Sequence, residues 1–165
     1  MPINILMMKK TMAILGDTGG FSPVFMEILV KLDIRLLFVS EDVAKNIKVK
    51  EQLESFRAAA EIEFISCERE GCWEADIIAV VRPENISPSL VDKIKEVATQ
   101  KTVLVISEEN KISKHPELEK LLPYSKVIEI ELDTPAKQFS VSGKDVEALS
   151  GIKSIFENAG YQFKI

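Results

Sequence analysis

The sequence predicts an α/β fold, with a doubly wound, mostly parallel sheet between two layers of helices, in a single three-layer domain over residues 1–165. Short apolar runs alternate along the chain with amphipathic segments, which is the order of strands and helices that a parallel sheet requires. A glycine-rich turn separates the first apolar run from the first amphipathic segment. The sequence shows no internal repeat, low-complexity tract or linker that would indicate a second domain.

Three strands and two helices are predicted in the N-terminal part of the chain. The first strand starts near Met8 and runs into the glycine-rich turn, and Ser22 with Pro23 is typical of a helix N-cap followed by proline. A charged segment over 42–60 predicts a surface helix between a buried strand at 36–39 and a half-exposed strand at 61–65. The first helix, over 23–32, places apolar residues on one face: Val24, Phe25, Ile28, Leu29 and Leu32.

The C-terminal part of the chain continues the same alternation. Fully apolar runs at 77–81 and 102–106 predict two more buried strands. Between them, Ser87 and Pro88 repeat the cap-and-proline signal before a helix that carries Leu90, Val91, Ile94 and Val97. The remaining elements are a short helix, two strands, a last helix that Gly160 ends, and a short final strand, predicted at 116–122, 127–132, 139–142, 145–158 and 161–165.

The glycine-rich turn is the candidate ligand site. Strand, tight turn and helix in this order present a nucleotide pyrophosphate to a helix N-terminus in a Rossmann unit. Gly16 permits the tight turn, Gly19 lets the main chain approach phosphate, and Ser22 replaces the third glycine of the motif. We therefore predict a dinucleotide loop made of Gly16, Asp17, Thr18, Gly19, Gly20, Phe21 and Ser22. A purely structural turn is the alternative, since turns use glycine with or without a ligand.

Composition and charge narrow the classes of protein. The net charge of −5 and the absence of a dense basic cluster argue against a nucleic-acid partner. No apolar stretch in the sequence is long enough to span a membrane. Cys67 and Cys72 lack the further ligand pairs of a zinc site, so we expect no metal and two free thiols in a reducing, cytoplasmic compartment. Residues 1–7 are interpreted as an N-terminal extension, either of the first strand or upstream of a start at Met8.

Three motifs carry a resemblance to a known family over residues 8–163. The chain resembles the 8-hydroxy-5-deazaflavin (coenzyme F-420)-dependent NADP reductases, a Rossmann group related to pyrroline-carboxylate and ketopantoate reductases. Residues 14–19 are similar to the family's I-L-G-G-T-G opening, with Asp17 in place of its second glycine. Residues 75–84 are similar to its A-D-(apolar)-A-V-P-P-E segment, and residues 141–161 to its last strand and helix. The resemblance implies a dinucleotide cofactor and an oxidoreductase ancestry.

Departures from the family pattern bear on the cofactor. After the second strand the chain has Ser40-Glu41-Asp42, where NADP-preferring members carry an arginine for the 2′-phosphate. A carboxylate at Glu41 accepts hydrogen bonds from a ribose diol and repels a 2′-phosphate, so NAD(H) is slightly favoured over NADP(H). The alternative is that Glu41 and Asp42 cap the following helix. At the end of the fourth strand, Val81, Arg82 and Pro83 join the predicted cofactor site, and Arg82 replaces the first proline of the family's turn.

Catalytic residues cannot be assigned from the spacing of side chains. The family continues past its last helix with segments of the deazaflavin site, so we expect a homodimer or a partner protein to complete any acceptor site. The sequence thus predicts an NAD(P)-binding oxidoreductase-like protein. Two alternatives stay open: a non-catalytic nucleotide-sensing or protein-interaction module, and a binder of CoA or an adenine nucleotide in the same crevice. Trp73 is a further candidate, either for stacking on adenine or for packing.

Overall fold

The computed structural model describes residues 9–15, 23–81, 87–108, 118–133 and 135–164. Within these ranges the strands form one eight-stranded sheet in the order β3-β2-β1-β4-β5-β6-β7-β8. The strands are β1 (Thr11–Leu15), β2 (Arg35–Val39), β3 (Glu61–Ile65), β4 (Ile77–Val81), β5 (Thr102–Glu108), β6 (Lys126–Asp133), β7 (Gln138–Gly143) and β8 (Gln162–Phe163). The described helices are α2 (Pro23–Lys31), α3 (Val43–Leu53), α4 (Glu68–Glu74), α5 (Pro88–Ile94), α6 (Leu118–Leu121) and α7 (Val146–Asn158).

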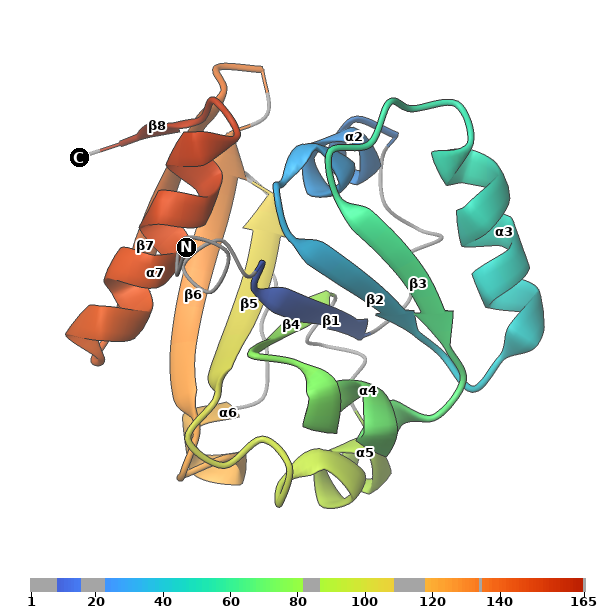
Figure 1. The fold of residues 1–165 in the computed structure, drawn as a ribbon. Helices are drawn as coiled ribbons and strands as arrows, with labels where there is room; N and C mark the ends of the chain where they lie inside the picture. The colour runs from blue at the N-terminus through green and yellow to red at the C-terminus, as the bar shows by residue number, and fades with distance from the viewer. Residues whose placement is uncertain (1–8, 16–22, 82–86, 109–117, 134, 165) are drawn as a thin grey trace, which may run out of the picture.

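The sheet reverses its winding direction at β1. Its neighbours are β2 on one side and β4 on the other, both parallel to it, with Ala13 opposite Leu37 and Ile78. Every other pair in the sheet is also parallel except β6 with β7. Figure 1 shows how the chain winds outward from β1 to β3 and then crosses back to β4 and on toward β8. In doubly wound sheets such a reversal opens a crevice at the carboxyl ends of the strands.

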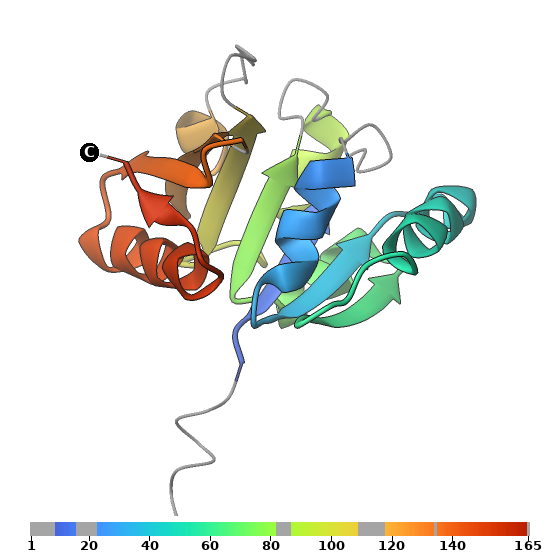
Figure 2. The same ribbon diagram turned by 90° about the horizontal axis from the view of Figure 1, so that it is seen from above.

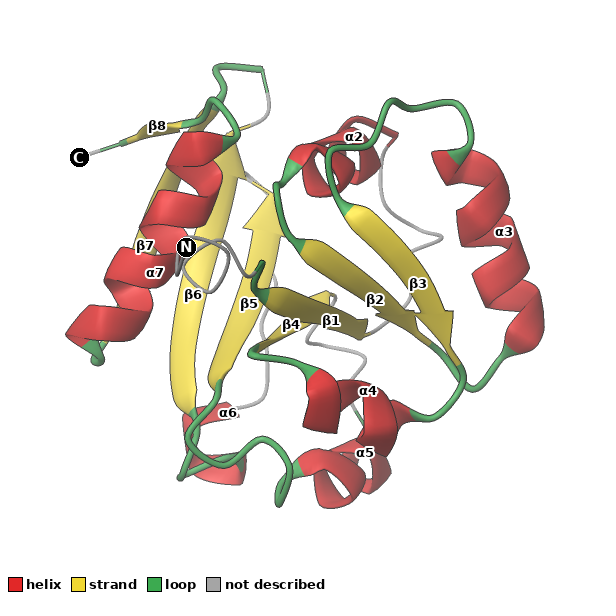
Figure 3. Ribbon diagram, in the orientation of Figure 1, coloured by secondary structure: helices red, strands yellow, loops and turns green. Residues whose placement is uncertain are grey.

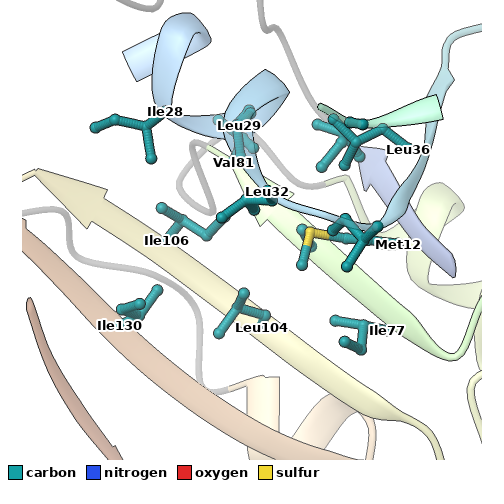
Figure 4. Packing of buried hydrophobic residues seen from close by; sticks show 14 of the residues in the cluster. Met12, Ile28, Leu29, Leu32, Leu36, Ile77, Val81, Leu104, Ile106 and Ile130 are labelled. Carbon is teal, nitrogen blue, oxygen red and sulfur yellow. The ribbon is translucent and has the colours of Figure 1, made fainter. Parts of the chain in front are cut away.

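Helices cover both faces of this sheet, as the apolar runs predict. Residues of α2, α3 and α7 pack with alternate strand residues such as Met12, Ile77 and Leu104 into one buried cluster. The other residues of the same strands, such as Ala13 and Ile78, pack with α4, α5 and α6 into a second cluster. Figure 3 shows the two helix layers, and Figure 4 shows α2 residues meeting the first cluster on the strands. The doubly wound three-layer α/β fold class is therefore confirmed.

Several local signals in the sequence correspond to observed caps. The Ser87 hydroxyl accepts a hydrogen bond from the Leu90 amide, and Pro88 occupies the first turn of α5. Gly160 has a φ of +96° directly after α7, a left-handed conformation that glycine adopts without strain. On α2, Ile28 and Leu29 are buried as predicted. The Ser22 cap lies outside the described residues.

Other predictions of helix and strand extent were wrong. The helix predicted over 42–60 ends at Leu53, because the amides of Ala59 and Ala60 both bond the Val30 carbonyl and turn the chain into β3. α4 was missed, since only Gly71 and Cys72 of its seven residues are buried and leave no periodic apolar pattern. The final strand is shorter than predicted, covering only Gln162 and Phe163. Within the described ranges, no helix combines the length and the hydropathy needed to cross a bilayer.

Candidate functional site

The carboxyl edge of the sheet near β1 holds the part of the predicted site that the structure describes. Figure 2 shows β4 and β5 with their arrowheads at the same end of the molecule. At this edge β1 ends at Leu15, β2 at Val39 and β4 at Val81. The described members of the predicted site are Ser40, Glu41 and Val81. Gly16, Asp17, Thr18, Gly19, Gly20, Phe21, Ser22, Arg82 and Pro83 lie outside the described residues.

The turn that follows β2 separates the roles of its two carboxylates. Asp42 caps α3: its Oδ1 accepts hydrogen bonds from the amides of Ala44 at 3.0 Å and Lys45 at 3.4 Å. The Ser40 hydroxyl accepts a bond from the Asp42 amide at 3.1 Å, which fixes the approach to the helix. The helix-capping alternative therefore holds for Asp42. No capping bond from Glu41 is among the side-chain contacts of α3 in the described part of the chain.

Glu41 instead makes a contact that the sequence did not indicate. Its Oε1 lies 2.9 Å from Nζ of Lys93 in α5, and the same ammonium lies 3.6 Å from Oε1 of Glu68 at the start of α4. Glu41 and Lys93 are both largely exposed, whereas the side chain of Glu68 is 17% exposed. One cation thus joins two carboxylates, and the three residues come from three different elements. Because the sequence predicts that the ribose of a dinucleotide binds at Glu41, we call Glu41, Lys93 and Glu68 the ribose-turn cluster.

The electrostatics of the ribose-turn cluster differ between its two acids. The hydrogen bond and charge of Lys93 lower the pKa of Glu41, so this carboxylate is ionised at neutral pH. Burial and then the neighbouring Glu41 charge raise the pKa of Glu68. The pKa of Lys93 is raised, mainly by its hydrogen bond to Glu41. The cluster therefore consists of an ion pair between Glu41 and Lys93, beside the Glu68 carboxyl group, whose pKa is raised.

Val81, Ser107 and Asp76 are buried or hydrogen-bonded to the main chain of neighbouring strands. The Val81 side chain is fully buried in the hydrophobic cluster beneath α2, α3 and α7, so a ligand could reach only its main chain. At the end of β5 the Ser107 hydroxyl donates a hydrogen bond to the Ile130 carbonyl at 3.4 Å. Asp76, in the family-like segment before β4, accepts a hydrogen bond from the Thr11 amide at 2.9 Å and so links β4 to the start of β1. This aspartate is a structural residue at the opposite edge.

Trp73 lies near the amino edge of the sheet, opposite the edge where the dinucleotide is predicted. It stands near the end of α4, the helix that returns the chain to the start of β4. Its carbonyl and that of Cys72 accept hydrogen bonds from Nζ of Lys101, which directly precedes β5. The indole is 70% exposed, so the interpretation of Trp73 as a packing residue is wrong. Its place at the end of α4, before the start of β4, does not support stacking on an adenine at the carboxyl edge, and stacking stays a prediction.

A groove of about 380 Å³ also lies at the amino edge, between α7 and the sheet. Its lining includes Lys10, Asp76, Thr102 and Lys126, which stand at or before the first residues of their strands, and Gly151 on α7. This groove is separated from the ribose-turn cluster by the length of the strands. Among the described residues, no group of histidine, cysteine and acidic side chains is placed to hold a metal ion.

Comparisons with known proteins give similarity in fold without similarity in sequence. No family model and no curated protein matches the chain. Solved structures that match include a candidate coenzyme F-420-dependent NADP reductase from an Arthrobacter species. Its TM-score is 0.63 and its identity 11%, over 94% of this chain and 83% of that one.

Two further matches are reductases whose structures contain a bound cofactor. Pyrroline carboxylate reductase from Plasmodium falciparum, solved with NADP bound, has a TM-score of 0.60 and 18% identity, covering 94% of this chain and 56% of that one. Imine reductase from Aspergillus terreus, in complex with NADPH4, has a TM-score of 0.57 and 13% identity, covering 95% and 54%. This chain thus spans about half the length of these two enzymes. At such low identities, the likeness establishes the fold of NAD(P)-binding Rossmann domains.

Proposed function

We propose that this protein binds a dinucleotide, NAD(H) or NADP(H), at the carboxyl edge of β1, β2 and β4, as an oxidoreductase-like Rossmann module. The proposed site comprises the loop at 16–22, the turn at Ser40 and Glu41, and residues 81–83. Within the reductase fold, the resemblance of three sequence motifs favours a relative of the deazaflavin-dependent NADP reductases. We leave the substrate and the catalytic residues unassigned.

The observation that carries this proposal is that Asp42, and not Glu41, caps α3 in the turn after β2. Asp42 supplies the cap of α3, so the Glu41 carboxylate, two residues past the end of β2, has no capping role and pairs with Lys93 at the sheet edge. In Rossmann domains an acidic residue at this place accepts hydrogen bonds from the adenosine ribose. Because the winding reverses at β1, the neighbour of β2, we expect the crevice for such a ligand beside this turn. This arrangement favours a dinucleotide; the Glu41 charge by itself favours NAD(H), and its ion pair with Lys93 weakens that preference.

A thermal-shift measurement tests the proposal. The full chain is melted alone and with NAD, NADH, NADP, NADPH, CoA and ATP. A ligand that binds only the folded state at a hundredfold excess over its Kd stabilises it by about 2.7 kcal/mol. For a protein of this size that stabilisation corresponds to a rise in Tm of about 5–11 °C. A dinucleotide is expected to give the largest rise.

Two glycine variants make this test specific to the loop. Gly19→Leu places a side chain where the main chain is proposed to approach the pyrophosphate, so the dinucleotide shift should disappear. Gly151→Ala is the matched control, because a Cβ at Gly151 in α7 meets no atom within 4 Å. It should retain the full ligand shift. A larger shift with CoA or ATP than with any dinucleotide contradicts the proposal, as does an equal ligand shift in Gly19→Leu and the parent.

A further inference from the structure

In the ribose-turn cluster, the Lys93 ammonium is hydrogen-bonded to Glu41, the carboxylate that we propose binds the ribose. Nζ of Lys93 lies 2.9 Å from Oε1 of Glu41, although 52 positions separate the two residues in sequence. Lys93 comes from α5, on the face of the sheet opposite to α2 and α3, and reaches past the end of β2 to meet Glu41. The turn itself reads Ser40-Glu41-Asp42, so it lacks the arginine that NADP-preferring members of the similar family carry there.

Lys93 lies within reach of the place where a 2′-phosphate would bind if Glu41 marks the position of the ribose. A 2′-phosphate occupies the same site as the 2′-hydroxyl that Glu41 would bind, because it is attached to that oxygen. An ammonium within hydrogen-bonding distance of Glu41 is therefore also within reach of a phosphate oxygen at that site. The Glu41 side chain is 58% exposed, so it has room to rotate toward solvent when an anion takes its place beside Lys93.

We propose that Lys93 is a cofactor-selecting residue that binds the 2′-phosphate of NADP(H), while Glu41 binds the ribose hydroxyls of NAD(H), so that this site accepts both cofactors. The inference rests on the proposed function. Glu41 is compensated by Lys93 in the free protein, so it repels a 2′-phosphate less than an isolated carboxylate would. When NADP(H) binds, Lys93 exchanges the carboxylate for the phosphate. Glu68, held 3.6 Å from the same ammonium, keeps Lys93 at the turn in both states.

The alternative role of Lys93 is to tie α5 to the turn after β2 without contacting a ligand. The two roles differ in what they predict for the pair of cofactors. A lysine that only pairs with Glu41 would affect NADPH solely by leaving that carboxylate uncompensated, so in a Glu41→Gln background Lys93→Gln would no longer change the NADPH-to-NADH affinity ratio. A phosphate-binding lysine changes only the affinity for the 2′-phosphorylated form.

The test measures four dissociation constants by calorimetry on the full chain, for NADH, NADPH, 5′-AMP and 2′,5′-ADP. In Lys93→Gln, the Kd for NADPH and for 2′,5′-ADP should rise by about tenfold to a hundredfold, the amount that one charge-assisted hydrogen bond contributes. The Kd for NADH and for 5′-AMP should change by less than about twofold. Lys93→Arg keeps the positive charge and should retain NADPH binding. This variant still tests the proposal if Lys93→Gln fails to fold.

Lys95→Gln is the matched control for charge. Lys95 follows α5 by one residue, and its Nζ pairs with Asp92 at 3.6 Å in place of the ribose-turn cluster. Its removal should leave the NADPH-to-NADH affinity ratio unchanged. An unchanged NADPH-to-NADH affinity ratio in Lys93→Gln would overturn the role of Lys93 while leaving dinucleotide binding intact. If the parent binds none of the four probes, the proposed function fails as well.

Discussion

The close approach of α4 to the end of β2 gives a quantitative prediction for Gly71. A Cβ built on Gly71 would lie 2.6 Å from Cγ2 and 3.3 Å from Cγ1 of Val39, the last residue of β2 before the Ser40 turn. Val39 is 4% exposed, so any other χ1 rotamer would turn its methyl groups into surroundings that are already packed, and the valine has little room to move away. Gly71→Ala should therefore overpack this contact.

The expected magnitude comes from two opposing effects. An alanine in a helix interior is favoured over glycine by about 1 kcal/mol. Overpacking of a filled core costs about 1–3 kcal/mol. Gly151→Ala, in α7, has the first effect without the second, because its Cβ meets nothing within 4 Å. The free energy of unfolding of Gly71→Ala should thus lie about 1–3 kcal/mol below that of Gly151→Ala, and Gly151→Ala should exceed the parent by about 1 kcal/mol.

Urea denaturation of the two variants, with Val39→Ala alone and combined with Gly71→Ala, measures this difference. Val39→Ala removes two buried methyl groups and should itself cost about 1.6 kcal/mol. Without those methyl groups the clash disappears, so the double variant should be more stable than the sum of the single effects predicts, by about 1–3 kcal/mol. Equal stability of Gly71→Ala and Gly151→Ala, or strict additivity with Val39→Ala, would refute the overpacking argument.

Three further predictions concern the cofactor, the thiols and the assembly. Glu41→Arg should shift the NADPH-to-NADH affinity ratio by at least about tenfold toward NADPH; an unchanged ratio in calorimetry defeats the assignment of Glu41 to the ribose. Burial raises the pKa of Cys72 from its ordinary 9.0 to about 12, so a thiol reagent at about pH 8 should label only the exposed Cys67 until the protein is unfolded. Because the pKa of Cys72 is higher in the folded state than in the unfolded state, this thiol contributes stability that is present below pH 9.0 and is lost as the pH rises toward 12. The free energy of unfolding should fall by at most about 1.4 kcal/mol per pH unit over that range. Cys72→Ala should make this alkaline decline less steep. Light scattering at micromolar concentration should give a homodimer mass, and a monomer mass contradicts the predicted self-association.

The turn after β2 carries two neighbouring carboxylates whose roles the sequence did not separate. The pattern Ser40-Glu41-Asp42 placed two carboxylates at the predicted turn but left open which of them caps the helix. That choice depends on main-chain geometry, because only the side chain whose oxygen meets the first free amides of α3 can cap it. Asp42 has that position and Glu41 does not. The contact between Lys93 and Glu41 likewise bears on the choice between NADP and NAD, and 52 positions separate these two residues in the sequence.

The sequence by itself determined the fold class and most of its elements. Apolar runs such as 77–81 specify buried strands, and Ser87 with Pro88 specifies a helix start, because these signals depend only on neighbouring residues. Tertiary structure alone decided the course of α4, the exposure of Trp73 and the contact between Glu41 and Lys93. These features arise where the chain crosses from one face of the sheet to the other. The crossover brings together residues that no local periodicity connects, so their contacts can be known only from the folded chain.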